Sequence, residues 1–316
     1  MRLLLAVDSV ATTEMIMNAV TSRQWPRGTR ARVLSVVEDE AVPAEVWREA
    51  GYTVDAVQQE MERRGEQVSA LTVEPLRRLG IEAEVTIMRG DPSWLINFEA
   101  RGWSADMILI RAHNRTDFRN WMLGSVARSV AREATCSVEV VRPRVFSPTG
   151  ISNGRMKILL TTDGSIHSNE AARVFAARPW PEGSEVKVMS MVNPIAYSVE
   201  ELGLYQGGRT ERAHQAIGEA ARILGEAGLR VSAEVVAGRA ARRIIEAAKE
   251  MGADLVAVGT EDRRGLGRLL FGSVSEEVAN GAHCSVSIFR GPAAGGGRSL
   301  TAIHHAEVYE GRSVFT

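Results

Sequence analysis

Small, acidic and hydroxyl residues gather at three places in the second half of this chain, each beside a short apolar run. Asp163-Gly164-Ser165 follows one run, Gly259 ends another, and Gly272-Ser273-Val274-Ser275 opens a segment with helical spacing. A helix N-terminus offers unpaired N–H groups and partial positive charge, so it can hold phosphate oxygens. Gly272 would also let a ligand approach the backbone closely. The pattern predicts a site for a phosphorylated small molecule.

The start of the last segment has a second interpretation as a purely structural helix cap. Ser273 suits an N-cap, and Glu276, three residues later, would complete a capping box. A Gly-Ser cap on its own is more often structural than functional. Its combination with Gly259 and a glycine-rich loop between them favours a binding site.

The chain repeats itself along its length. Residues 157–192 match residues 2–37 at a constant offset of 155, and residues 228–290 match residues 80–142 at an offset of 148. The matches include glycines, aspartates and a Gly-Ser pair, which serve backbone geometry or sites rather than burial alone. A period of about 150 residues is the size of a whole domain. We therefore expect two tandem domains with the same fold.

Each copy alternates apolar runs with amphipathic segments. The runs lack strict polar alternation, which indicates strands buried on both faces, as in a parallel sheet. Alternating strands and helices predict a doubly wound α/β fold. We place the first copy at residues 1–145, the second copy at 155–290, and a flexible linker with a C-terminal tail at 291–316, where glycines follow Arg290.

Composition excludes several classes of protein. The formal net charge of -1 gives no electrostatic reason to expect a nucleic acid or an anionic membrane as partner. No apolar stretch is long enough to span a bilayer, and the apolar start of the chain recurs internally at Lys157–Asp163, so we interpret it as a strand and not a leader. We expect a cytoplasmic protein. Cys136 and Cys284 then stand as small residues at strand starts and not as a disulfide.

No catalytic constellation stands out. The six histidines show no metal-binding spacing, and the chain has neither a P-loop nor a Gly-x-Ser-x-Gly elbow. We expect no enzyme, with at most slow hydrolysis of bound ATP, and no metal site.

The motifs, in their order, resemble the universal stress protein family. They are Asp163-Gly164-Ser165, Gly238, the run Ala253–Gly259 and the segment Gly265–Ser275, and the resemblance covers both copies. It implies a tandem member with two five-stranded parallel sheets of order 3-2-1-4-5. Helices flank each sheet, as in the adenine nucleotide alpha hydrolase-like fold. It also implies domains that pair through their last strands, and a homo-oligomer such as a dimer is expected.

Relatives that bind ATP share a loop of Gly, two residues, Gly, nine residues, Gly and then Ser or Thr. In the second copy this resemblance places Asp163 near the ribose or adenine, Met191 near the base, and Gly272, Ser273 and Val274 around the phosphates. The expected nucleotide-binding set is completed by Gly164, Ser165, Gly259, Asp262 and Ser275.

Asp262 stands where the loop's second glycine is expected. Aspartate tolerates a left-handed backbone, so the loop shape can survive. A carboxylate about 4 Å from a phosphate costs about 1 kcal/mol in water and several when water is excluded. Asp262 would oppose a triphosphate unless Mg²⁺ bridges them or Arg263 and Arg264 offset it; alternatively it is an exposed turn residue that points away.

The first copy departs further from the loop pattern. By the same resemblance its degenerate site comprises Asp8, Val36, Arg111, Asn114, Gly124 and Ser125. Arg111 replaces the first glycine and would either fill the mouth of the site or pair with Asp8, and Asn114 replaces the second glycine. We expect ATP, possibly with Mg²⁺, in the second copy rather than the first.

Two functions from different classes follow. The first is a stress-response regulator that binds an adenine nucleotide mainly through the second copy and signals through conformation or partner binding. The alternative is an interaction scaffold with both pockets vestigial, which Arg111 and Asp262 favour. An adenylyl transferase is disfavoured because the paired catalytic residues for phosphate chemistry are missing.

Overall fold

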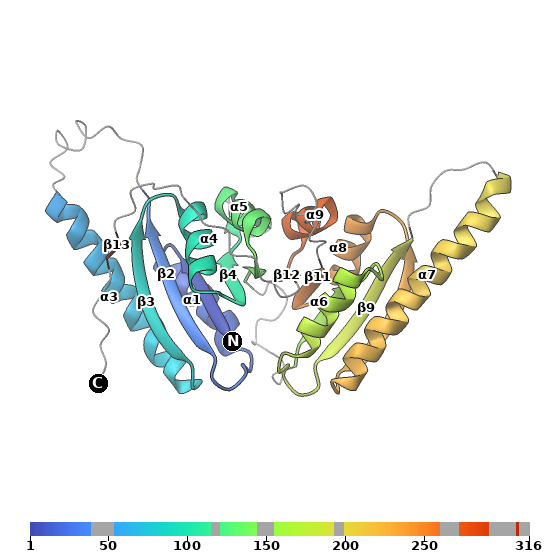
Figure 1. Ribbon diagram of the computed structural model, residues 1–316, viewed down its shortest axis with the longest axis horizontal. Helices are drawn as coiled ribbons and strands as arrows, with labels where there is room; N and C mark the ends of the chain where they lie inside the picture. Colours follow the sequence, from blue (N-terminus) through green and yellow to red (C-terminus); the bar gives the residue numbers. More distant parts are fainter. Residues whose placement is uncertain are drawn as a thin grey trace. The chain divides into compact units, whose positions relative to one another are not determined.

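The computed structural model describes residues 1–38, 54–114, 121–143, 155–192, 199–259, 272–290 and 308–309 (Figure 1). The chain divides into two compact units, which are described one at a time. Unit 1 comprises residues 1–21, 26–111 and 293–316, and unit 2 comprises residues 22–25 and 112–292. The units do not follow the limits of the two copies, because the end of the first copy packs with the second.

Unit 1 is a parallel sheet with one short antiparallel strand at its edge. Its strands are β1 (Arg2–Val7), β2 (Arg30–Val37), β3 (Glu82–Arg89), β4 (Met107–Arg111) and β13 (Val308–Tyr309), in the order β4-β1-β2-β3-β13. Its helices are α1 (Val10–Thr21), α3 (Val54–Arg78) and α4 (Pro92–Gly102). Every residue from Leu3 to Val7 is buried, which explains why this strand shows no polar alternation.

Unit 2 contains the complete second copy. Its sheet has the order β10-β9-β8-β11-β12-β7, from β7 (Ser137–Val141), β8 (Lys157–Thr161), β9 (Glu185–Val192), β10 (Arg230–Ala237), β11 (Leu255–Gly259) and β12 (Ser285–Phe289). Its helices are α5 (Ser125–Glu133), α6 (Ile166–Ala176), α7 (Val199–Glu226), α8 (Ala240–Met251) and α9 (Ser273–Gly281), and β5 (His113–Asn114) pairs separately with β6 (Trp121–Met122). The predicted order 3-2-1-4-5 is confirmed in β10-β9-β8-β11-β12.

The last strands of the two copies pair with each other, as the family resemblance implied. β7 runs antiparallel to β12, with Glu139 directly opposite Ser287. Glu139 is fully buried and forms a two-fold ion pair with Arg23, whose Nη1 and Nη2 lie 2.7 and 2.5 Å from its carboxylate oxygens. A charge without access to water requires such a partner, so this ion pair is part of the packing around β7.

Two buried arginines at equivalent positions of the copies reinforce this pairing. Arg142 follows β7 and donates to the carbonyl oxygens of Ala279 and Cys284, whereas Arg290 follows β12 and donates to those of Ala131 and Cys136. Ala131 and Ala279 lie near the C-terminal ends of α5 and α9, where free carbonyls favour a cation. Each copy thus caps a helix of the other. Burial lowers the pKa of Arg142 to about 10.

Cys136 and Cys284 lie next to the paired strands, and the structure has no disulfide at either residue. Cys284 is buried, and burial raises the pKa of its thiol to about 12. Cys136 is half-buried. Because the thiolate is the reactive form, we expect a maleimide to label Cys136 in the native protein and Cys284 only after unfolding. The measurement is labelling followed by mass spectrometry, with Cys136→Ser as the control that removes the early adduct; equal labelling rates would contradict the prediction.

Candidate functional site

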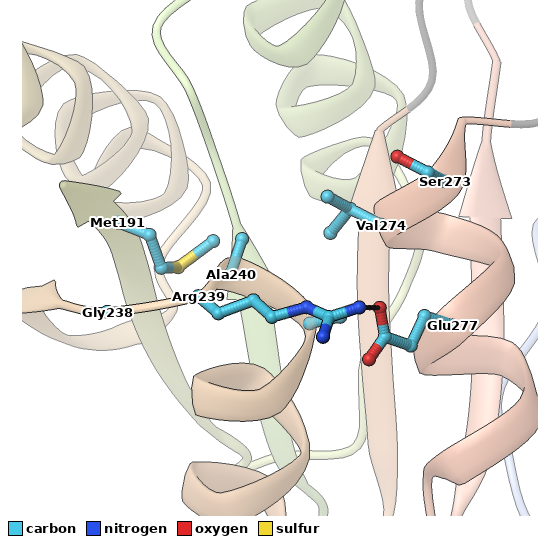
Figure 2. Close-up of a pocket in the computed structure, with 8 residues that line it drawn as sticks. Met191, Gly238, Arg239, Ala240, Ser273, Val274 and Glu277 are labelled. Atoms are coloured by element: carbon cyan, nitrogen blue, oxygen red, sulfur yellow. Dashed lines mark hydrogen bonds and ion pairs between the residues drawn. The ribbon is translucent and has the colours of Figure 1, made fainter. Parts of the chain in front are cut away.

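A pocket of about 270 Å³ opens at the carboxyl ends of β9 and β10 in unit 2 (Figure 2). Its lining comes from three places: the end of β9, the turn from β10 into α8, and the first two turns of α9. The lining residues are Met191, Gly238, Arg239, Ala240, Ala241, Ser273, Val274 and Glu277. The strand order reverses beside it, since β8 pairs with β9 on one side and with β11 on the other. Open α/β sheets bind ligands at this kind of position.

The start of α9 borders the pocket, and it differs from the prediction. The N-cap residue is Gly272, with φ -62° and ψ 146°, and no side chain hydrogen bonds to the cap. The predicted capping box is wrong, because Ser273 is already the first helical residue. Glu276 instead lies 3.3 Å from Arg128 and 3.0 Å from Arg132, both on α5. A helix start without a side-chain cap keeps its first N–H groups available to an anion.

The turn from β10 into α8 forms the opposite side of the pocket. Gly238 has a φ of +138°, and its N–H donates to the carbonyl of Val192 at 3.0 Å, so the turn requires a glycine. Arg239 is the N-cap residue of α8 and makes no side-chain cap. Its guanidinium reaches across the pocket to Glu277, with Nη2 3.0 Å from Oε2 (Figure 2). The pocket therefore contains one cation and one carboxylate, already paired.

Asp163 lies in the turn after β8. Its Oδ1 accepts a hydrogen bond from the N–H of Ser165 at 2.9 Å, and Gly164 between them has a φ of +76°. Ser165 is the N-cap of α6, and its hydroxyl accepts a hydrogen bond from the N–H of Ser168 at 3.1 Å. Burial works to raise the pKa of Asp163, but hydrogen bonds from Ser165 and Ser168 outweigh it and hold the pKa below its ordinary value. Asp163 is thus a charged acceptor at this edge of the sheet.

The first copy contains one of the two arrangements that its sequence allowed. Arg111 Nη2 lies 3.7 Å from Asp8 Oδ2, so the residue at the loop's first glycine position is paired with the strand-end aspartate. Asp8 also accepts from Ser9 at 2.9 Å and from Thr12. The acidic residue of the first copy is therefore engaged by its own neighbours.

The remaining expected residues of the first copy are spread over both units. Val36 is a buried residue of β2 in unit 1. Asn114 belongs to β5, Gly124 is the N-cap of α5, and Ser125 is its first residue, all in unit 2. Only the latter two repeat the geometry of Gly272 and Ser273.

Three residues predicted for the second site line the pocket: Met191, Ser273 and Val274. Asp163, Gly164, Ser165, Gly259, Gly272 and Ser275 are described but do not line it, and Asp262 lies outside the described residues. Ser275 is buried, and Gly259 packs so closely on α6 that a Cβ would lie 3.2 Å from that of Ala171. Burial of Ser275 and close packing at Gly259 therefore account for these two residue types without a ligand.

Sequence reasoning missed the charged residues of the pocket, Arg239 and Glu277. One signal was available: at the offset of 148, Arg239 corresponds to Asp91, so the copies carry opposite charges at one position. Asp91 caps α4 by accepting from the N–H of Trp94 at 2.7 Å, whereas Arg239 leaves its helix without a side-chain cap.

Within the described ranges, no group of three or more His, Cys, Asp or Glu side chains is arranged to hold a metal ion. The helices of the described part of the chain include none that is long and apolar enough to cross a membrane.

Known proteins resemble this chain in sequence and in fold. The model of the universal stress protein family matches residues 1–142 and 154–290. Universal stress protein MJ0531 of Methanocaldococcus jannaschii is 31% identical over 144 residues, which cover 43% of this chain and 82% of that protein. Universal stress protein Rv2005c of Mycobacterium tuberculosis is 28% identical over 222 residues, 68% of this chain and 70% of its own. The crystal structure of a universal stress protein from Archaeoglobus fulgidus covers 92% of this chain and 96% of its own, at 18% identity and a TM-score of 0.61.

Proposed function

The chain belongs to the universal stress protein family, whose members often bind ATP, and from this we propose that it is a stress-response regulator which binds ATP or a related adenine nucleotide mainly through its second copy. The observation that carries the proposal is the pocket between the end of β9, the β10–α8 turn and the start of α9. It combines an apolar wall at Met191 and Val274 with a helix start that no side chain caps. An adenine ring suits the first feature and phosphates suit the second.

The preference for the second copy rests on a difference between equivalent residues. Arg111 pairs with Asp8 in the first copy, where the second copy has Gly259 and Asp163. A nucleotide would have to break that ion pair before it could use Asp8. The Asp163 carboxylate, in contrast, has no ion pair among the described residues and accepts hydrogen bonds from Ser165 and Ser168.

Nucleotide binding would serve regulation and would not lead to a catalysed reaction. The proposed output is a change in conformation or in a partner surface, with at most slow hydrolysis of the bound ATP. The paired last strands β7 and β12 join the copies, and we propose that the protein acts as a homo-oligomer, for which a dimer is the simplest form.

The proposal is tested by calorimetric titration of the full chain with ATP and Mg²⁺. We expect saturable binding with close to one site per chain, because the described pocket lies in the second copy and Asp8 of the first copy is paired with Arg111. Two equal sites would contradict the preference between the copies. A flat trace at millimolar nucleotide would contradict nucleotide binding altogether.

A scaffold without nucleotide is the second candidate function, favoured by the two ion pairs Arg111–Asp8 and Arg239–Glu277. Both occupy positions where a ligand is expected. The purified protein distinguishes the candidates: a nucleotide ultraviolet spectrum released on denaturation, or a rise in the melting temperature on adding ATP, supports the regulator. The absence of both supports the scaffold.

A further inference from the structure

The ion pair in the pocket exists only in the second copy. Arg239 and Glu277 correspond, at the offset of 148, to Asp91 and Ser129 in the first copy. Neither partner of the pair is present there, although the surrounding turn and helix are repeated. The two residues are 38 positions apart in the chain, and both line the pocket, Arg239 as the N-cap of α8 and Glu277 from α9.

This ion pair is weak enough to be exchanged. The side chain of Arg239 is 76% exposed and that of Glu277 is 40% exposed. An exposed pair of this kind contributes about 0–1 kcal/mol, because water screens it and both side chains lose freedom. A phosphate offers the guanidinium more oxygens and more charge than a carboxylate, and arginine suits such oxygens because its planar group can bind two at once.

The other features of the pocket do not compete for Arg239. Among the described residues that line it, Glu277 is the one acidic residue, and the members other than Arg239 are apolar, glycine or serine. The helix α8 begins at Ala240, without a carboxylate in its first turn. Glu277 is thus the anion that an incoming ligand would replace.

We propose that Arg239 binds a phosphate of the nucleotide and that Glu277 holds Arg239 in the empty pocket as a competing anion. Phosphate binding then exchanges one partner of Arg239 for another and leaves Glu277 free at the start of α9. This inference rests on the proposed function and deepens it: the pocket selects phosphorylated nucleosides over the bare nucleoside, and the exchange moves a charge between two helices when the ligand arrives.

The test is a double-mutant cycle measured by calorimetry on the full chain, with ATP and adenosine as the two ligands. We expect Arg239→Gln to weaken ATP binding about tenfold, the size of one charge-assisted contact. Glu277→Gln should strengthen ATP binding about threefold to fivefold, the value of an exposed ion pair. In the double variant the gain from Glu277→Gln should disappear, because Glu277 acts through Arg239. Adenosine binding should not change in any variant.

Arg242→Gln is the matched control. Arg242 is also 76% exposed and also pairs with a glutamate, Glu246, but it does not line the pocket, so ATP affinity should not change. A gain from Glu277→Gln that persists without Arg239 would overturn the exchange, since Glu277 would then act by simple repulsion. Unchanged ATP affinity in Arg239→Gln would overturn the inference but leave the proposed function intact. Flat traces with ATP in the wild type and in every variant would refute both.

Discussion

Gly272→Val is expected to abolish ATP binding and to leave the fold intact. Among the residues that the structure describes, no atom lies within 4 Å of where a Cβ would stand, and the backbone, at φ -62° and ψ 146°, lies in a region open to every residue. Valine therefore fits the protein. Its two methyl groups would, however, stand at the N-cap of α9, where a phosphate must approach the first N–H groups. We expect affinity to fall at least about a hundredfold, or about 2.8 kcal/mol.

The control for this change is provided by the first copy. Gly124 is the N-cap of α5, with φ -61° and ψ 163°, so Gly124→Val makes the same change at the equivalent place. It should leave ATP binding unchanged, because the first copy has its Arg111–Asp8 ion pair and no proposed ligand. Calorimetry measures the affinity, and circular dichroism with thermal melting checks the fold. Equal losses in the two variants would contradict the assignment of the site to the second copy alone.

Glu139→Ala is expected to lower the free energy of unfolding by about 3–5 kcal/mol, because it leaves the charge of Arg23 buried without its partner. Both side chains are shielded from water, with exposures of 0% for Glu139 and 7% for Arg23. The Arg23 guanidinium makes two short contacts to the Glu139 carboxylate, so a single substitution removes both. Urea unfolding monitored by circular dichroism measures the loss.

Two further variants separate loss of the charge pair from loss of packing. The double change Arg23→Met with Glu139→Leu should recover most of the stability, since replacing a whole buried ion pair by apolar residues is often neutral. Ser287→Ala is the matched control across the strand pair. Ser287 is fully buried opposite Glu139, and its hydroxyl has no hydrogen-bond partner among the described residues, so its removal should cost little. A double variant as unstable as Glu139→Ala would contradict the ion-pair explanation.

Residue patterns close together in the chain predicted the elements well. The run Leu3–Val7 has no polar alternation and is a fully buried strand, as expected for a parallel sheet. The capping box at Ser273 failed for a reason that lies elsewhere in the chain. Glu276 is held by Arg128 and Arg132 on α5, about 145 residues earlier, and Gly272 takes the N-cap position.

The site was predicted in part, and the residues that were not predicted are its charged pair. Ser273 and Val274 could be found because they follow a glycine at a predicted helix start, and Met191 was placed by the family resemblance. Arg239 and Glu277 could not be paired from the sequence, since the chain contains 38 Lys and Arg residues and 39 Asp and Glu residues. Which of them meet depends on the folded geometry.

The amino-acid sequence by itself determined that this protein is a duplicated, doubly wound α/β fold whose second copy has a helix that begins at a Gly-Ser pair. These properties depend on periodicity and short-range spacing, which can be read along the chain. Only the tertiary structure decided that Arg111 pairs with Asp8, that Arg23 neutralises Glu139, and that the pocket contains an Arg239–Glu277 pair. The physical reason is that the energy of a charge depends on its burial and on the few ångströms to its partner, and distant segments come that close only when the sheet assembles.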